Sequence, residues 1–406
     1  QTDRQTDRQT DRQTDRQNTM SGWGSFGDDT PATSSSSTPG KLKAKARLPP
    51  IPVSWEMQRV LDQPDTADNL ALLRAQASLS EGNRLRRAGD YFGALMKYER
   101  ARAAAGELRD GMRAAKMDCA ALGSIGIVHL KRGDASKAVD HITRALECAR
   151  ANEDRRGEQR WLGSLGNAHQ NMSSYFTAID LFTQALQINR DIGNKRGEGS
   201  QLGNLGVACL GAGDYEAAVG HLTQALRISR AVRDKRGESA RLGNLGNAQQ
   251  QMGNYEEAVS LCLQALDISK AIRDKKGEAA HRSNLGFSYA ALEDYDNVVL
   301  HHDLALGMVR ATGNLPEECS VQRSLADAYD HTGDYPKAVV HYSNALNIQR
   351  ILGSGGDSNK NAEAVATLEK KLAAAKENKV EWDQQQRERD RLAFLEQSKV
   401  RIRWWP

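Results

Sequence analysis

The sequence predicts an all-α protein whose helices stack in pairs as an α-solenoid. Two observations support this fold class: a motif recurs with a period of 40 residues, and the apolar and small residues within each copy have helical spacing. The recurring position holds Gly126, Gly166, Gly206, Gly246, Gly286 and finally Ala326. One further copy lies upstream, where Gly82 precedes Gly126 by 44 residues. Together these copies indicate a protein of seven repeats.

Each copy has the pattern of two antiparallel helices. In one of them, Leu242, Leu245 and Gly246 belong to the first segment, and Tyr255 and Ala258 belong to the second. A Gly-Asp-Tyr or Gly-Asn-Tyr turn separates the two segments, as at residues 213–215, 253–255 and 333–335. Glycine accepts the left-handed backbone that ends a helix, and Asp or Asn caps the next helix. A connector such as "DKRGE" (residues 234–238) leads to the following pair, with its aspartate as the expected N-cap.

The small residues inside these helices are predicted to let helices approach closely. They are the glycines Gly126, Gly166, Gly206, Gly246 and Gly286 and, nineteen residues after each, Ala145, Ala185, Ala225, Ala265 and Ala305. A glycine-rich stretch such as "RLGNLGNAQQQMGNYEEAV" (residues 241–259) could instead bind a phosphate. That function needs a preceding strand or a following Gly-Lys-Ser/Thr, and the stretch has neither. We therefore expect packing glycines and no cofactor.

These residues resemble the tetratricopeptide repeat in the patterns Asn-Leu-Gly-Asn-Ala, Gly-Asp/Asn-Tyr and Ala-Leu. The resemblance extends from about Leu70 to Leu352. It implies that residues 55–352 form a solenoid of about seven repeats, wound as a right-handed superhelix. It also implies that the first helix of each pair lines a concave groove that binds a peptide or helix of a partner protein.

The 40-residue period and the "DKRGE" connector are similar to the longer repeat variant of Pins/LGN-type G-protein-signalling modulators. Proteins of that type carry C-terminal motifs that bind G-alpha subunits. The tail "LAFLEQSKVRIRWW" (residues 392–405) shares little beyond Gln-Ser with that motif. G-alpha binding is therefore not expected of this chain.

Polar residues recur at the family's groove positions in the first helices. A side-chain amide both donates to and accepts from a peptide backbone, which suits binding of an extended chain. Asparagine is also a poor helix former, so its recurrence inside helices favours a binding function over exposed polar faces alone, the remaining alternative. The predicted groove residues are Arg160, Asn167, Gln170, Asn204, Asn244, Asn247, Gln250 and Asn284.

Composition excludes several classes of function. The chain has 406 residues and a net charge of +4, which is too small to indicate nucleic acid as the main partner. No apolar run approaches the roughly 20 residues that span a bilayer. No Ser/His/Asp or Cys/His set has a spacing that implies catalysis, so we expect no enzyme activity.

The cysteines and four repeated histidines are predicted to be structural. The five cysteines, an odd and scattered set, are expected to be reduced thiols that act as small core residues, without a disulfide framework or metal site. Histidines recur at residues 141, 221, 301 and 341. Ligands must lie about 2 Å from a shared ion, whereas packed helix axes are about 8–10 Å apart, so these histidines are expected on half-buried helix faces. Reduced cysteines favour a cytoplasmic location, which includes the cytoskeleton and cilia.

The two termini differ from the repeats. Residues 1–54 have the composition of a disordered segment, and residues 1–19, with their four-residue period, are expected to be translated repeat sequence before Met20. Residues 353–359 are expected to form a flexible break. Val365, Leu368, Leu372 and Ala375 then have the spacing of a helix that caps the solenoid, followed by a charged helix with weak coiled-coil character within residues 353–406.

Two function classes follow from the sequence. The first is a non-enzymatic scaffold that binds an extended peptide or helix of a partner in its groove. The alternative is a structural subunit of a ciliary or cytoskeletal assembly, docked through its convex face and C-terminal helix.

Overall fold

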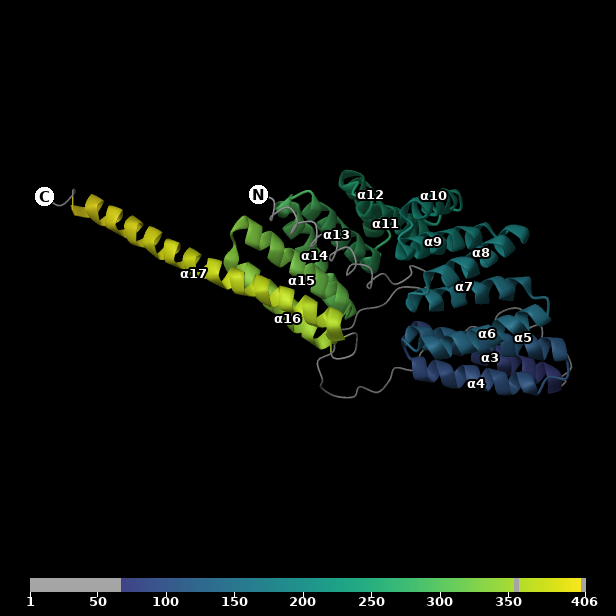
Figure 1. Cartoon of the computed structure of the whole chain (residues 1–406). Coiled ribbons are helices and arrows are strands. Elements are labelled where there is room, and N and C mark those ends of the chain that lie inside the picture. The colour runs from purple at the N-terminus through teal and green to yellow at the C-terminus, as the bar shows by residue number, and fades with distance from the viewer. Residues whose placement is uncertain (1–66, 354–357, 403–406) are drawn as a thin grey trace. The chain divides into compact units, whose positions relative to one another are not determined.

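The computed structural model describes residues 67–353 and 358–402, and this part of the chain is helical throughout, with turns between the helices and no strand. Fourteen helices, α3 to α16, form seven consecutive antiparallel pairs, and a fifteenth, α17, follows them (Figure 1). The predicted all-α solenoid of helix pairs is therefore confirmed. The prediction of a disordered segment at residues 1–54 lies outside the described residues.

The described residues fall into two compact units, 67–234 and 235–402. The first unit contains four helix pairs: α3 (Ala67–Arg87) with α4 (Tyr91–Gly106), α5 (Gly111–Lys131) with α6 (Ala135–Ala151), α7 (Arg155–Asn171) with α8 (Tyr175–Asp191), and α9 (Lys195–Ala212) with α10 (Tyr215–Ala231). The second contains α11 (Lys235–Gln251) with α12 (Tyr255–Ala271), α13 (Lys275–Ala291) with α14 (Tyr295–Thr312), α15 (Leu315–Thr332) with α16 (Tyr335–Gly353), and α17 (Ser358–Ile402).

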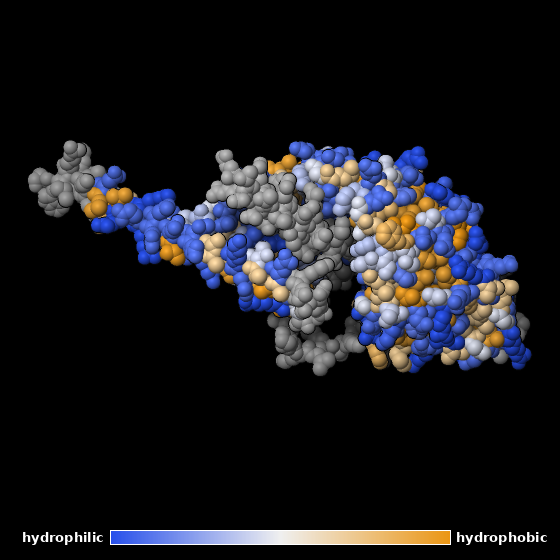
Figure 2. Space-filling model, in the orientation of Figure 1, coloured by the Kyte–Doolittle hydropathy of each residue, from blue (hydrophilic) through white to orange (hydrophobic). Residues whose placement is uncertain are grey.

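The helix α17 covers the last helix pair with its first turns only. Leu368, Leu372 and Ala375 are buried against α16, and Val365 is partly buried beside them. Beyond Lys376 the helix continues without a break; its residues 377–396 are largely exposed, and their visible face is mostly hydrophilic (Figure 2). A single helix therefore contains both the capping segment and the charged segment that the sequence analysis treats separately.

The turns inside each pair have left-handed backbone at the position that is glycine in most copies. Gly133, Gly213, Gly253 and Gly333 have φ between 80° and 87°, and the equivalent Ser173 has φ of 58°. Left-handed backbone costs a residue with a β-carbon roughly 1–2 kcal/mol. Glycine therefore recurs at this position because it has no β-carbon and avoids this cost.

The "DKRGE"-type connectors start the first helix of the next pair. The Asp154 side chain accepts a hydrogen bond from the Gly157 backbone N–H at 3.0 Å, and Asn194 accepts from Gly197 at 3.1 Å. A β-carbon on Gly157 would lie 2.5 Å from Asp154 Oδ2. The glycine of the connector thus leaves room for the capping side chain that satisfies a free N–H of the first turn.

The glycine marked by the 40-residue period lies where the two helices of a pair touch. A β-carbon on Gly126 would lie 2.5 Å from Ile142, one on Gly166 2.5 Å from Phe182, and one on Gly246 2.6 Å from the Cys262 sulfur. Gly206 is in equally close contact with Leu222, and Gly286 with His302. Ala145, Ala185, Ala225, Ala265 and Ala305 are all completely buried.

A second glycine, three residues earlier, has a different role that the sequence analysis missed. Gly123 lies against the Trp161 ring of the next repeat, and Gly163 lies against Gln201, whose Nε2 is 2.8 Å from the position of an added β-carbon. Gly243 contacts His281 in the same way. At Gly123, Gly163 and Gly243 the first glycine of the Gly-x-x-Gly pair therefore admits a side chain of the following repeat, and the second glycine admits the partner helix of its own repeat.

Candidate partner-binding face of the first helices

In the unit 67–234, the predicted groove residues lie on α7 and α9, two first helices that contact each other. Arg160 is exposed, with its guanidinium carbon 4.7 Å from the centre of the Trp161 ring. Asn167 and Asn204 are half-buried, and Gln170 is 7% exposed. The structure therefore brings four predicted polar residues onto two neighbouring helices.

Side-chain amides on these two helices have unused hydrogen-bonding capacity. Asn167 Oδ1 and Gln170 Oε1 are buried without a hydrogen-bond partner in the described part of the chain. Asn204 makes no side-chain hydrogen bond to the described residues either. Each amide has two N–H donors and one acceptor oxygen, and an unpaired buried acceptor costs about 1–3 kcal/mol. Asn167 and Gln170 therefore gain free energy from a partner that supplies hydrogen bonds, and Asn204 is accessible to the same partner.

Gln201 belongs with this group, although the sequence analysis did not select it. It lies on α9, is 7% exposed, and its Oε1 also lacks a hydrogen-bond partner among the described residues. The equivalent positions 40 residues apart hold Trp161, Arg241 and His281. The sequence shows that Gln201 is polar. Only the structure shows that its position packs against Gly163 of the preceding repeat.

The other four predicted residues lie in the unit 235–402 and are more deeply placed. Asn244, Asn247 and Asn284 are 4%, 8% and 2% exposed. Burial raises the pKa of the Cys262 thiol on the neighbouring helix α12, and the nearby Asn284 side chain opposes this rise. Gln250 is half-buried and its Oε1 accepts a hydrogen bond from the Ser288 hydroxyl at 3.5 Å. Asn284 and Gln250 therefore make contacts within the protein itself.

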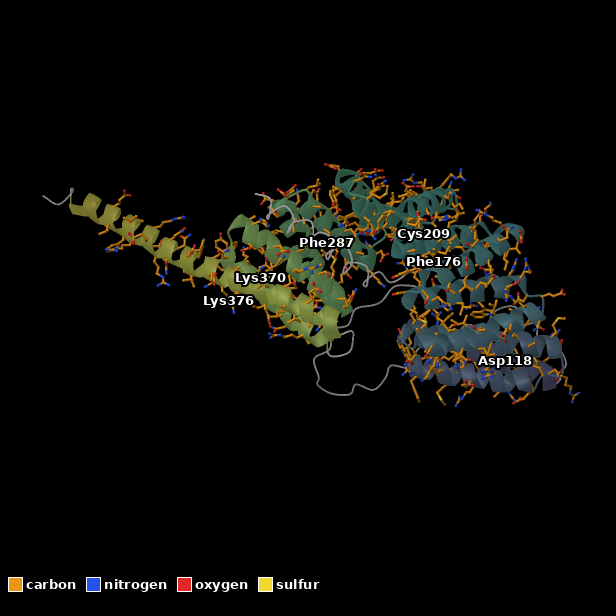
Figure 3. The ribbon with its side chains drawn as sticks, in the orientation of Figure 1. Asp118, Phe176, Cys209, Phe287, Lys370 and Lys376 are labelled. Carbon is orange, nitrogen blue, oxygen red and sulfur yellow. A yellow bond between two sulfur atoms is a disulfide. The ribbon has the colours of Figure 1, made fainter. Side chains whose placement is uncertain are left out.

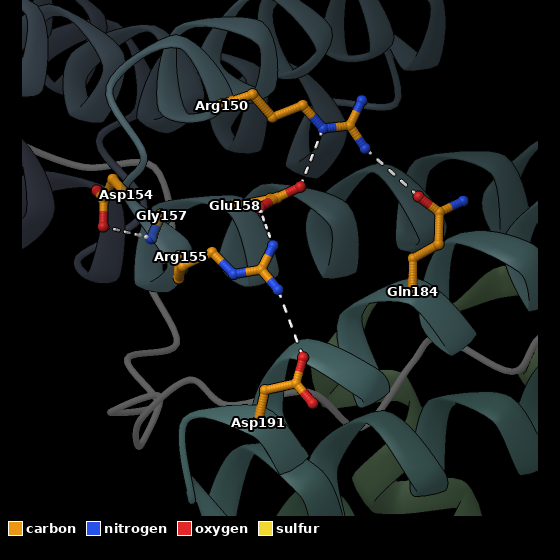
Figure 4. A network of polar contacts seen from close by, with 7 residues as sticks. All are labelled: Arg150, Asp154, Arg155, Gly157, Glu158, Gln184 and Asp191. Atoms are coloured by element: carbon orange, nitrogen blue, oxygen red, sulfur yellow. Dashed lines mark hydrogen bonds and ion pairs between the residues drawn. The ribbon is translucent and has the colours of Figure 1, made fainter.

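An ion-pair network orients α7 at its N-terminal end (Figure 4). Glu158, whose side chain is 13% exposed, pairs with Arg150 of α6 at 3.0 Å and with Arg155 of its own first turn at 2.9 Å. Arg155 also reaches Asp191 of α8 at 3.4 Å. Side chains from three successive helices are thus linked where α7 begins.

The same network recurs in the next repeat. Glu198 pairs with Arg190 at 3.2 Å and Lys195 at 2.8 Å. The hydrogen bond from Lys195, supported by the Arg190 contact and opposed by burial, holds the pKa of Glu198 below its usual value. The glutamate of the "DKRGE" connector is therefore an ion-pair centre, and the helices that carry the candidate site are fixed at their N-terminal ends.

The repeated histidines pack inside helix pairs. His141 stacks on His129 with ring centres 5.5 Å apart, and His341 stacks on Tyr329 at 5.4 Å. Burial lowers the pKa of His141, His221, His301 and His341. The described residues contain no group of three or more His, Cys, Asp or Glu side chains arranged to hold a metal ion.

The cysteines correct one expectation from the sequence. Cys119 of α5 and Cys148 of α6 form a disulfide, so the prediction of five free thiols is wrong for this pair. The cause is geometric, since the two positions face each other across the helix pair with Cα atoms 5.8 Å apart. Cys209 (labelled in Figure 3), Cys262 and Cys319 are buried free thiols, as expected.

Among the helices within residues 67–353 and 358–402, none combines the length and apolar character that a bilayer-spanning helix requires.

Comparison with known proteins identifies the repeat. Residues 157–231 and 238–311 match the family model described as tetratricopeptide repeat, so the chain contains the repeats that the sequence analysis expects. Among curated protein sequences, none matches the chain.

Solved structures with the same fold are distant in sequence. The apo form of RapI shares 17% identity, with 69% of this chain and 99% of that chain covered and a TM-score of 0.56. A Rap protein complexed with Competence and Sporulation Factor shares 16% identity over 74% and 80% of the two chains, with a TM-score of 0.53. Aspartyl phosphate phosphatase F from Bacillus subtilis shares 13% over 74% and 82%, with a TM-score of 0.55. At these identities the similarity shows the fold alone.

Proposed function

We propose that this chain, which contains tetratricopeptide repeats at residues 157–231 and 238–311, is a non-enzymatic scaffold that binds an extended segment of a partner protein. The candidate binding face is the polar surface of α7 and α9, with Arg160, Asn167 and Asn204 as its accessible residues. Gln170 and Gln201 lie behind them as supporting amides.

The observation that carries this proposal is the set of side-chain amides on two adjacent first helices whose oxygens have no hydrogen-bond partner in the described part of the chain. A peptide backbone presents alternating N–H and C=O groups, which side-chain amides match without using charge. Arg160 adds a fixed positive charge beside this set, which suits a carboxylate of the same segment. An uncharged or mildly acidic peptide segment therefore fits this face better than a basic one.

One structural neighbour gives this proposal indirect support. The Rap protein with a TM-score of 0.53 was solved in complex with Competence and Sporulation Factor, so a protein of this fold accommodates a bound factor. The proposal for the present chain depends on its own amide set, because the sequence identity is 16%.

The proposal is tested with a double substitution, Asn167→Ala with Asn204→Ala. Partners captured by proximity labelling and pull-down with the parent protein are expected to be lost from this variant. Circular dichroism should remain unchanged, because both side chains are only half-buried and neither holds another residue in place.

A matched control changes two exposed polar residues on a second helix. Thr223→Ala with Gln224→Ala alters exposed positions on α10, a second helix of the same unit. This variant is expected to retain the partners. Equal retention by both variants would show that the face of α7 and α9 is not the binding site.

The exposed part of α17 favours a second candidate function. Leu392, Phe394 and Leu395 are 54%, 72% and 45% exposed on the segment beyond the capping turns. In this alternative the chain is a structural subunit of a ciliary or cytoskeletal assembly, held through its outer face and this helix. Truncation after Lys376 keeps the capping residues, so a partner lost only on truncation would support the alternative.

The 40-residue period suggests a resemblance to Pins/LGN-type modulators, and this resemblance raises the question of whether the partner is a G-alpha subunit. We propose that the resemblance concerns the repeats alone and that the partner is a protein other than a G-alpha subunit, met in the cytoplasm. A direct binding measurement with purified G-alpha, expected to be negative, tests this part.

A further inference from the structure

The disulfide between Cys119 and Cys148 closes one end of a helix pair. The helices α5 and α6 are joined by the turn at residues 132–134, and the two cysteines lie toward the opposite, open end of the pair. They are 29 residues apart in sequence. The disulfide therefore closes α5, α6 and the turn between them into a covalent loop.

The fold holds these two positions together in other repeats, where no bond forms. Gly199 and Ile228 occupy the equivalent positions in α9 and α10, and a β-carbon on Gly199 would lie 2.9 Å from Ile228 Cγ2. Cys319 of α15 is equivalent to Cys119, but Ile348 occupies the position opposite it. The contact between the two positions is thus a property of the repeat, so α5 and α6 retain their packing when the bond is reduced.

The two sulfurs differ in accessibility. Cys119 is 5% exposed, whereas Cys148 is half-buried near the end of α6. The Cys148 sulfur lies 3.8 Å from the Asn152 side-chain nitrogen and 3.5 Å from the Ala115 carbonyl oxygen. Thiol–disulfide exchange requires approach of a thiolate to one sulfur of the bond. Cys148 provides that sulfur.

The remaining cysteines lack this reactivity. Burial raises the pKa of Cys209 to about 11 and that of Cys262 to about 12, and it also raises the pKa of Cys319. These thiols are protonated at neutral pH, and the protonated thiol is a poor nucleophile. Redox chemistry in the described part of the chain is therefore confined to one pair.

We propose that Cys119 and Cys148 are a reversible oxidation site that fastens and releases the open end of the α5–α6 pair. In reduction, the thiolate of a small thiol such as glutathione attacks the Cys148 sulfur, and the sulfur–sulfur bond breaks. Cys119 leaves as a thiolate and takes up a proton. A second small thiol then attacks the mixed disulfide, which releases Cys148 as a thiol and the small thiol as its own disulfide. Oxidised glutathione drives the reverse reaction.

Reduction of the disulfide changes the stability of its own repeat and of the adjacent repeats, because a solenoid's stability is a sum of repeat and neighbour terms. In the oxidised protein, the C-terminal part of α6 cannot separate from α5. In the reduced protein, this end is held by packing alone and opens more often. Backbone amides near Cys119 and Cys148 therefore exchange hydrogen several-fold faster after reduction, whereas those of α15 and α16 are unaffected.

The test equilibrates the full-length native protein in glutathione buffers of increasing reduced-to-oxidised ratio. Alkylation and mass spectrometry then count free thiols, and hydrogen exchange measures local opening. We expect Cys119 and Cys148 to become alkylated together as the ratio rises, with faster exchange in residues 111–119 and 145–151. A bond that persists until the protein unfolds would overturn the proposal, and so would two thiols that never pair in oxidised glutathione.

Two variants keep the test independent of misfolding. Cys148→Ile introduces the residue found at the equivalent positions Ile188, Ile228 and Ile348, so it is expected to fold and to show no exchange response to glutathione. Cys319→Ser removes the equivalent cysteine that has no cysteine opposite it, and its response should match that of the parent. A response that survives in Cys148→Ile would also contradict the proposal.

Discussion

The sulfur of Cys262 lies 2.6 Å from the position that a β-carbon on Gly246 would occupy, and the Ala258 carbonyl oxygen lies 3.2 Å from the same point. The first and second helices of this repeat therefore touch through the backbone of Gly246. A larger side chain must displace α12, because backbone atoms border the site.

The first prediction concerns Gly246→Leu. Overpacking of this kind costs typically about 1–3 kcal/mol, and in a solenoid the loss falls on the altered repeat and its neighbours. Hydrogen exchange should show faster opening of α11 to α13 than of α15 and α16. A matched control is Gly307→Ala on α14, where nothing lies within 4 Å of an added β-carbon. Unchanged protection in residues 235–305 of Gly246→Leu would refute the packing role.

The second prediction concerns Ser173, whose φ of 58° places it in the left-handed region. Its equivalents Gly133 and Gly213 have no β-carbon to accommodate there. Relief of the roughly 1–2 kcal/mol penalty, less the greater chain entropy of unfolded glycine, leaves a gain of about 0.5–1 kcal/mol for Ser173→Gly. Urea denaturation measures the gain. The reciprocal Gly213→Ser should lose a similar amount, and a loss in both variants would contradict this account.

The third prediction is a loss of stability at acid pH caused by two buried histidines. Burial lowers the pKa of His281 to about 4 and that of His302 to about 3, from an ordinary value of 6.5. A depressed histidine pKa means that the unfolded chain takes up protons first as pH falls. The stability contributed by the neutral rings is therefore complete above pH 6.5 and declines progressively toward pH 4.

The surroundings of the His281 and His302 rings show that His302 is the better position at which to test this prediction. His281 Nε2 is 2.9 Å from the Ser239 hydroxyl, and the nearby Asp274 opposes the shift in its pKa. His302 is completely buried, has no hydrogen-bond partner among the described residues, and packs edge-on against Phe287. Its equivalent in α10 is Leu222.

His302→Leu should therefore reduce the acid sensitivity without loss of stability at neutral pH. Thermal melting curves between pH 7.5 and 5 provide the measurement. An undiminished dependence of the melting temperature on pH in this variant would exclude His302 as a source.

The repeat architecture follows from the sequence because its determinants are local. Capping residues, left-handed turn positions and small residues at Gly246 or Ala265 recur at a fixed period, and each acts within one helix pair. The disulfide and the deep placement of Asn284 depend on which positions face each other across two helices. That information is absent from periodicity alone, although Gly199 and Ile228 show that one facing relationship applies to several repeats.

The accessibility of the candidate binding residues was the least predictable feature. Asn204 and Asn284 occupy the same repeat position, yet the first is half-buried without a side-chain partner in the described chain, whereas the second is 2% exposed and lies near the Cys262 thiol. The residue that precedes each asparagine by 22 positions differs: it is Cys262 on α12 for Asn284 and Phe182 on α8 for Asn204. A phenylalanine side chain has no atom that accepts a conventional hydrogen bond, so Asn204 remains available.

The last prediction concerns the ion-pair centre Glu198. Its side chain is 11% exposed and receives charged hydrogen bonds from Lys195 and Arg190. Glu198→Gln retains the shape but removes the charge, and we expect a loss of about 1 kcal/mol, between the values of exposed and buried charged pairs. The control is Glu147→Gln on α6, an exposed glutamate that forms no ion pair with the described residues and should change little.

The dependence on pH distinguishes this effect from a general packing defect. Because the folded pKa of Glu198 lies below its ordinary value of 4.5, its contribution is fully present above pH 4.5 and is lost as pH falls further. The difference in urea midpoint between the parent and Glu198→Gln should therefore be constant from pH 7 to pH 5 and shrink below pH 4.5. A difference that stays constant down to pH 3 would show that the side chain acts through shape and not through charge.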